Sequence, residues 1–180
     1  MCPDAAGLLL IGYGNPGRLD DGLGPALAEA IEALHLPGVA VEANYQLTVE
    51  DAAELANHRI VVFADADVAG PEPFWVRRLE PSAGGLTFST HSVKPADVLA
   101  LGRQLFGAEP EAYVLGIRGY EFNEFGERLS DKARANLDAA IRYVEEAVQT
   151  GTFQEVRPDG GQTDEPQATG EDDSCRMEST

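Results

Sequence analysis

The sequence predicts an α/β fold: a three-layer sandwich in which a mostly parallel, five-stranded twisted sheet is covered by helices on both faces. Short, almost wholly apolar runs, typical of strands buried in a parallel sheet, recur along the chain. Between them lie segments whose apolar residues follow the spacing of an amphipathic helix. This alternation indicates βαβ connections, which make the strands parallel and place helices on the two faces of the sheet.

Each element has a local signal. Leu8–Tyr13 is an apolar run closed by glycine, and the spacing of Leu23, Leu27, Ile31 and Leu34 predicts a helix over 23–35. The elements that follow are a strand at 39–42, a helix at 48–56 with Thr48 as N-cap, a strand at 60–64 and an edge strand at 75–79. A helix that opens at Pro95, a strand at 112–117 and a closing helix at 130–149 complete the prediction.

Composition divides the chain near residue 150. Residues 151–180 contain eight acidic and two basic side chains and few apolar ones, which predicts an acidic, disordered C-terminal tail. Residues 1–150 hold nearly all the aliphatic side chains and are expected to form one α/β domain. A chain of that length buries about 70% of its unfolded surface, which is enough for a real core.

The charge balance excludes several classes of partner. The 180-residue chain carries 13 Lys and Arg against 31 Asp and Glu, whereas binding to nucleic acid or anionic membranes relies on clustered basic side chains. No apolar run approaches the ~20 residues of a membrane span, and the start of the chain has no signal-peptide pattern. Cys2 and Cys175 provide no disulfide framework. We expect a cytoplasmic protein, monomeric when free, without nucleic-acid or membrane partners.

The glycine-rich segment after the first strand allows two interpretations. Gly12–Gly17 matches the G-x-G-x-x-G pattern of dinucleotide-binding domains, and Glu42 is placed to be the acid that binds the ribose. Against this, residues 18–22 separate the last glycine from the predicted helix. Asp20 and Asp21 would also repel a phosphate from the N-terminus of that helix.

Several carboxylates follow strands at the edge of the sheet where ligands bind in parallel α/β folds. One of Asp20 and Asp21 is expected to cap the first helix, which leaves the other to face the crevice. Asp65 follows a buried apolar strand, a position where a carboxylate needs a partner or a ligand. Asp67 is the alternative occupant, because a spacing of two residues puts it on the same side of the strand.

One of the three histidines is expected at the same edge. His91 lies in the loop before the Pro95 helix, and this loop should return to the carboxyl ends of the strands. His35 and His58 are expected to be structural. Two carboxylates and one imidazole would form a three-ligand site for a divalent metal with coordination positions left open.

Three segments together resemble the [NiFe]-hydrogenase maturation endopeptidases. They are Gly12-Tyr13-Gly14-Asn15 with Asp20-Asp21-Gly22-Leu23-Gly24, then Phe63-Ala64-Asp65-Ala66, and Thr90-His91 ahead of Ala96-Asp97-Val98-Leu99. The resemblance extends from about Leu8 to Val148, which is most of the predicted domain. Gln46-Leu47-Thr48, Gly119 and Gly126-Glu127-Arg128-Leu129-Ser130 look most like the branch that serves NAD-linked, bidirectional hydrogenases.

The resemblance implies an endopeptidase that removes a short C-terminal peptide from the precursor of the hydrogenase large subunit, once nickel has been inserted into that precursor. The implied partner is this precursor, and the implied nickel belongs to the substrate, so that no cofactor of the protein's own is expected. Carried over to this sequence, the residues that reach the nickel and act in catalysis are Asp21, Asp65 and His91. Many members of the family have Glu at the position of Asp21, whose side chain is one methylene shorter.

Other hypotheses remain at this stage, and the peptidase itself is either aspartic-type or metal-assisted. A dinucleotide-binding Rossmann-like domain would bind NAD(P) or FAD. A non-catalytic hydrogenase assembly factor would bind the precursor without shortening it. An acidic peptidase would use Asp21 and Asp65 as a pair that shares one proton, and its activity would not depend on nickel.

Overall fold

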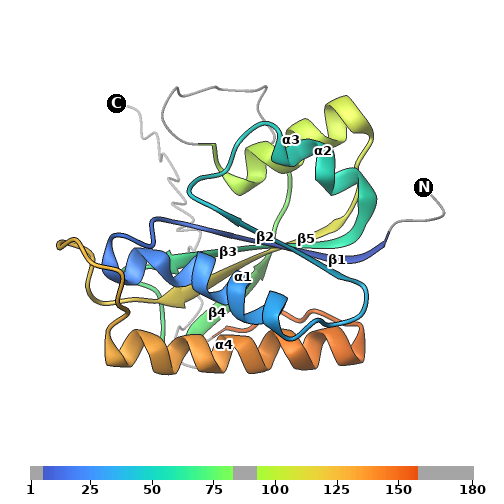
Figure 1. The fold of residues 1–180 in the computed structure, drawn as a ribbon. Coiled ribbons are helices and arrows are strands. Elements are labelled where there is room, and N and C mark those ends of the chain that lie inside the picture. Colours follow the sequence, from blue (N-terminus) through green and yellow to red (C-terminus); the bar gives the residue numbers. More distant parts are fainter. Residues whose placement is uncertain (1–5, 83–92, 158–180) are drawn as a thin grey trace, which may run out of the picture.

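The computed structural model describes residues 6–82 and 93–157, which form the predicted α/β sandwich (Figure 1). Every strand and helix predicted from the sequence is present, with bounds shifted by a few residues. In chain order the elements are β1 (Ala6–Tyr13), the 3₁₀ helix η1 (Leu19–Gly22), α1 (Leu23–Ala33), β2 (Val39–Asn44), α2 (Asp51–Glu54), the 3₁₀ helix η2 (Leu55–Asn57), β3 (His58–Asp67), β4 (Phe74–Arg78), α3 (Pro95–Phe106), β5 (Glu111–Arg118) and α4 (Asp131–Thr150).

The sheet has the strand order β2-β1-β3-β5-β4. β1 pairs in parallel with both β2 and β3, β3 pairs in parallel with β5, and β4 lies at the edge, antiparallel to β5. The chain therefore leaves β1 toward one side of the sheet and later returns on its other side as β3. Such a reversal leaves a crevice at the carboxyl ends of the two adjacent strands, where open α/β sheets bind their ligands.

Helices cover both faces of the sheet, α1 and α4 on one face and α2 and α3 on the other (Figure 1). The alternation of strand side chains divides the core accordingly. Leu8 and Leu10 of β1 belong to the cluster beneath α1 and α4, whereas Leu9 and Ile11 belong to the cluster beneath α2 and α3. No helix in the described part of the chain is long and apolar enough to cross a membrane.

Helices α1, α3 and α4 start within one residue of the predicted positions, whereas α2 does not. α3 opens with Pro95, and α4 is capped by Ser130, whose hydroxyl accepts a hydrogen bond from the Ala133 amide at 3.3 Å. Thr48 is not the N-cap of α2, contrary to the prediction, because the helix begins only at Asp51. The Asp51 carboxylate instead accepts a hydrogen bond from the Thr48 amide at 2.6 Å and orders the turn that precedes the helix.

The chain remains packed against the sheet after α4 ends. Phe153 is 6% exposed, and its ring packs against Tyr113 and Tyr143 with centroid distances of 5.7 and 5.9 Å. Val156 pairs with Val76 of β4 through two backbone hydrogen bonds of 3.0 Å. This short segment covers the outer edge of β4 and extends the core beyond the boundary predicted at residue 150, because two apolar residues suffice to anchor an otherwise polar stretch.

We therefore expect a chain that ends at residue 150 to be less stable than one that ends at residue 157. Loss of the buried Phe153 ring alone costs roughly 3–5 kcal/mol, whereas the longer chain retains Phe153 and Val156. Urea unfolding of both truncated chains and of the full chain measures the difference. Equal stability of all three would contradict the packing of residues 151–157. The rest of the predicted tail, 158–180, lies outside the described residues.

Candidate functional site

Helix α1 approaches the sheet very closely at the carboxyl ends of β1 and β3. A side chain at Gly24 would overlap backbone carbonyl oxygens of both strands, and one at Gly12 would overlap the Gly24 carbonyl. Gly14, whose φ of 139° favours glycine, packs against the carbonyl of Asp21. These glycines therefore bring η1 and the start of α1 onto the strand ends, and they place Asp21 at the crevice.

This packing argues against a dinucleotide site. In dinucleotide-binding loops the last glycine lies at the helix start, and free amides there hold the pyrophosphate. Here η1 separates Gly17 from Leu23, the first residue of α1. The Asn15 amide donates to the Asp21 carboxylate at 3.3 Å, so that a negative charge already lies against the loop.

Asp20 is fully buried and connects distant parts of the chain. Its carboxylate accepts hydrogen bonds from the amides of Tyr120, Glu121 and Ser130 at 2.8, 2.9 and 2.7 Å, and from the Ser130 hydroxyl at 2.7 Å. Burial by itself raises the pKa, but these donors outweigh it and hold the pKa of Asp20 below its usual value. The expectation that Asp20 or Asp21 caps the first helix is wrong, since no side chain caps α1.

Asp21 and Asp65 come together at the crevice between β1 and β3. Asp21 belongs to η1, and Asp65 lies near the end of β3 on the face covered by α2 and α3. The Asp65 carboxylate accepts a hydrogen bond from the Ala66 amide at 2.7 Å and interacts with the Tyr13 hydroxyl. Both carboxylates are partly exposed, so a ligand can reach them.

Electrostatics at this pair favour a bound cation. Burial raises the pKa of Asp65 to about 6; the Ala66 amide and the Tyr13 hydroxyl lower it in part, whereas the charges of Asp21 and Asp67 raise it further. Burial and the nearby Asp65 charge raise the pKa of Tyr13, so that its hydroxyl stays protonated. A cation would offset the repulsion between the carboxylates and stabilise the charged form of Asp65.

Asp67, the alternative occupant of the site, is engaged in the loop after β3. Its carboxylate accepts hydrogen bonds from the Ala69 and Gly70 amides at 2.9 and 2.8 Å and from the Trp75 indole at 2.7 Å. Although burial raises its pKa, these donors hold the pKa of Asp67 below its usual value. Of the two strand-end acids, Asp65 is therefore the one free to bind a ligand.

A hollow of about 330 Å³ opens beside Asp65 on the face covered by α3. The Trp75 ring forms part of its wall and packs on Gly116, where any side chain would collide with the indole. The hollow combines carboxylates with apolar walls, which suits a peptide segment. It is lined by Tyr13, Asp65, Ala66, Asp67, Trp75, Leu79, Pro95, Ala96, Val114 and Gly116.

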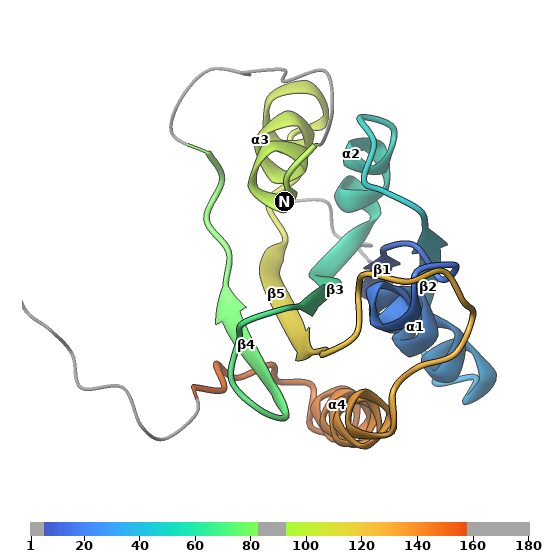
Figure 2. The ribbon, with the colours of Figure 1, turned by 90° about the vertical axis from the view of Figure 1, so that its left-hand side faces the viewer.

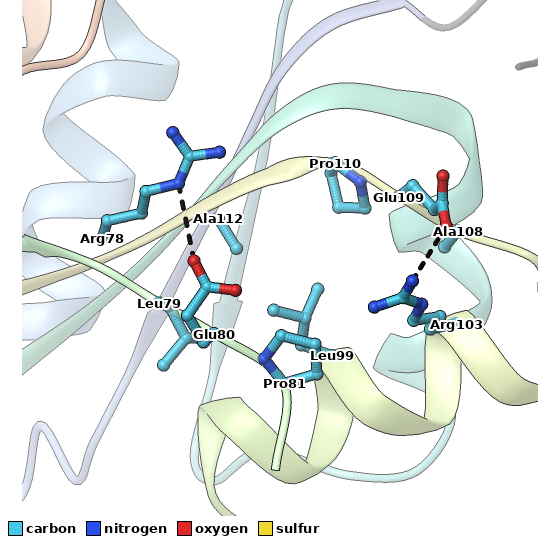
Figure 3. A pocket seen from close by; sticks show the side chains of 10 residues that line it. All are labelled: Arg78, Leu79, Glu80, Pro81, Leu99, Arg103, Ala108, Glu109, Pro110 and Ala112. Carbon is cyan, nitrogen blue, oxygen red and sulfur yellow. Dashed lines mark ion pairs between the residues drawn. The ribbon is translucent and has the colours of Figure 1, made fainter. Parts of the chain in front are cut away.

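A second hollow, of about 220 Å³, lies beside the carboxyl-terminal half of α3 (Figure 3). Its charged side chains pair with one another, Arg78 with Glu80 at 3.8 Å and Arg103 with Glu109 at 3.3 Å. Each carboxylate among its described lining residues thus already has a cation beside it. This chemistry is that of a surface depression, and the carboxylate pair at the strand ends is the stronger candidate site.

The third predicted ligand, His91, lies outside the described residues. Within residues 6–82 and 93–157, no three His, Cys, Asp or Glu side chains come together as a metal site. His35 follows the end of α1 and His58 begins β3, so both lie at the amino end of the sheet, away from the carboxylate pair.

Two aromatic residues of the site were not singled out from the sequence. Tyr13 could have been found, because strand alternation puts it on the same face as Leu9 and Ile11, one position before the glycine turn. Trp75 reaches the site from β4, through the pairing of β4 with β5, and no local pattern reveals that pairing.

The fold is similar to that of several solved hydrogenase maturation proteases, whereas no family model and no curated protein matches the chain. HybD from E. coli, a hydrogenase maturating endopeptidase, superposes with a TM-score of 0.62 at 22% identity, over 83% of this chain and 96% of that one. The [NiFe] hydrogenase maturation protease HycI from Thermococcus kodakarensis gives 0.60 at 21% identity, over 82% and 95%. The hydrogenase 2 maturation peptidase from a Thaumarchaeota archaeon gives 0.58 at 22%, over 80% and 98%. At these identities the likeness establishes the α/β fold.

We expect Asp20→Asn to destabilise the protein by about 3 kcal/mol at neutral pH. The carboxamide turns an N–H group toward donors that now face an anion, in a fully buried site. Because the folded pKa of Asp20 is lowered, its contribution is present above the unfolded pKa and is lost as the pH falls through the folded value. Urea unfolding from pH 3 to pH 8 measures this, with Asp138→Asn, at an exposed position on α4, as the control. If the difference in unfolding free energy between the wild type and Asp20→Asn is the same from pH 3 to pH 8, the pKa of Asp20 is not lowered by folding.

We expect the opposite sign for Asp65→Asn. The raised pKa of Asp65, about 6, means that its stabilising contribution is complete below the unfolded pKa and is lost as the pH rises through 6. At pH 8 the asparagine variant should be more stable than the wild type by about 1–2 kcal/mol, less than the full shift implies because water reaches part of the carboxylate. The gain should vanish near pH 4. If Asp65→Asn is less stable than the wild type at pH 8, the ionised Asp65 carboxylate does not destabilise the folded protein.

Proposed function

We propose that the protein is an endopeptidase that removes a C-terminal peptide from the nickel-loaded precursor of a [NiFe]-hydrogenase large subunit. The observation that carries the proposal is the partly buried carboxylate pair, Asp21 and Asp65, at the crevice between β1 and β3. The pair adjoins a hollow with apolar walls, which suits a peptide. The likeness to hydrogenase maturation proteases over most of the chain supports the same function.

In this proposal Asp21, Asp65 and His91 complete the coordination of the nickel that the precursor holds. His91 precedes Val93, the first described residue before α3, by two positions in the sequence. Val93 packs against the same apolar cluster as Tyr13, the partner of Asp65. The described chain thus resumes, two residues after His91, on the face of the sheet that carries Asp65, and this supports the proposal.

Two carboxylates and an imidazole bind borderline metals only moderately, which suits the recognition of a metal held mainly by another protein. Bound in this way, the substrate's nickel would fix the scissile bond and activate either its carbonyl or a water. No resident cofactor is needed for this chemistry, and we expect it to take place in the cytoplasm. The segments around Gln46 and Gly126 favour a precursor of the NAD-linked branch.

An arrangement in which the two acids share one proton receives less support. Asp65 hydrogen-bonds the Ala66 amide and the Tyr13 hydroxyl, and in the described part of the chain the Asp21 carboxylate bonds the Asn15 amide. Each carboxylate thus has donors of its own. A proton-sharing pair would require a direct hydrogen bond between the two.

Intact-mass spectrometry of the precursor, with and without nickel, tests the proposal. We expect the wild type to shorten only the nickel-loaded precursor. Asp21→Asn, Asp65→Asn and His91→Ala should lower the rate by at least about 100-fold, because each removes a contact to the metal that activates the substrate. Asp138→Asn, at an exposed position on α4, is the matched control and should leave the rate unchanged.

Each other result points to another function. Cleavage of the metal-free precursor at the same rate, rising as the pH falls, would indicate the acidic peptidase. Binding of the nickel-loaded precursor without any change of mass would indicate an assembly factor. Tight binding of NAD(P) that survives Asp21→Asn would indicate a dinucleotide-binding domain.

A further inference from the structure

Three large apolar side chains in the described loops around the candidate site are at least 63% exposed. Tyr45 is 65% exposed, Val68 is 63% exposed and Phe125 is 90% exposed. They follow β2, β3 and β5, so all three lie at the end of the sheet that carries Asp21 and Asp65, the end that faces the viewer in Figure 2. We call these residues and the loops that hold them the carboxyl-end rim.

The loop that carries Phe125 is held in place by hydrogen bonds to η1 and the turn before it. The Leu19 amide donates to the Gly126 carbonyl, and the Gly126 amide donates to the Gly17 carbonyl, both at 2.9 Å. The buried Asp20 carboxylate anchors the start of the same loop. Phe125 is thus displayed on an ordered backbone next to the segment that carries Asp21. Binding through Phe125 therefore costs little additional conformational entropy of the loop.

The other two loops are ordered in a similar way. The backbone after Val68 is fixed by Asp67, whose carboxylate accepts two amides of that loop. The Asn44 carbonyl accepts the Gly14 amide at 3.1 Å, and Asp51 accepts hydrogen bonds from Asn44 and Thr48 on either side of Tyr45. Exposed apolar side chains on ordered loops have the properties of interface anchors.

The rim is also acidic. Residues 45–50, 68–73 and 119–130 contain five glutamates and a single basic residue, Arg128. Arg128 is paired with Glu121 at 3.1 Å, so its charge is already balanced. Arg18 and Arg118 also reach these loops, where they donate to the Phe122 and Gly70 carbonyls, but the five glutamates still outnumber the bases. Charge complementarity therefore requires Lys or Arg on the surface of a binding partner.

We propose that the carboxyl-end rim docks the folded body of the substrate protein, through a basic face that surrounds recesses for Phe125 and Tyr45. This inference rests on the proposed function and adds a recognition surface separate from the metal contact. Anchors on three separate loops suit a protein surface more than a small ligand, and the rim adjoins the crevice that would receive the peptide. A second copy of the chain is the wrong partner, because two acidic rims repel each other.

Steady-state cleavage of the nickel-loaded precursor, with direct binding measured on the Asp65→Asn protein, tests this surface. We expect Phe125→Ala and Tyr45→Ala each to raise KM and Kd roughly tenfold or more, with kcat unchanged. Phe106→Ala is the matched control, since Phe106 is 50% exposed at the end of α3, close to the start of β5 and thus at the opposite, amino end of the sheet. It should change neither constant by more than about twofold.

Charge is tested in the same assay. Glu124→Lys should raise KM several-fold, whereas Glu146→Lys on the exposed side of α4 should not. Added salt should weaken binding of the wild type more than binding of Glu124→Lys. If Phe125→Ala leaves KM unchanged, or lowers only kcat, the docking surface is wrong. The proposed function would still hold in that case, provided that the wild type cleaves the precursor. A wild type that neither binds nor cleaves the precursor would overturn both.

Discussion

The buried carboxylate of Asp20 is the interaction on which the arrangement of the site depends. It joins η1 to a loop and a helix start that lie about a hundred residues later in the chain, through four short hydrogen bonds. An anion without solvent is stable only when donors surround it in this way. Because Asp20 is held inward, its neighbour Asp21 is left at the crevice beside Asp65. Asp20 thus fixes the loop after β5 and the start of α4 against η1, and Asp21 is available for chemistry.

The strand order and the glycines both shape the crevice between β1 and β3. Reversal of the chain at β1 leaves a crevice between β1 and β3, and the absence of side chains at Gly12, Gly14 and Gly24 lets α1 come down onto it. Burial of the Asp65 carboxylate at the end of β3, and to a lesser degree the nearby charge of Asp21, costs free energy that is reflected in the raised pKa of Asp65. Strongly shifted pKa values are common at binding sites, because a bound ligand can offset the cost of the buried charge.

Periodicity in the sequence predicted the elements and the sheet, since apolar spacing directly reflects which faces are buried. The predicted parallel sheet in turn placed Asp21 and Asp65 at the carboxyl ends of the strands, where such folds bind ligands. Three features could not be predicted, because each depends on contacts between residues distant in sequence: the partners of Asp20, the approach of Trp75 from β4, and the packing of Phe153. The neighbouring residues suggested that Asp20 caps a helix, but its carboxylate instead binds amides of a loop about a hundred residues away.

Trp75 has a consequence for experiment. It is the single tryptophan of the chain, and its indole lines the hollow beside Asp65, bonds Asp67 and lies under the guanidinium of Arg77 at 4.2 Å. Intrinsic fluorescence excited at the red edge of protein absorption therefore comes from one fluorophore at the candidate site. The emission maximum and its quenching by nickel or by a peptide report directly on occupancy of that hollow, without any label.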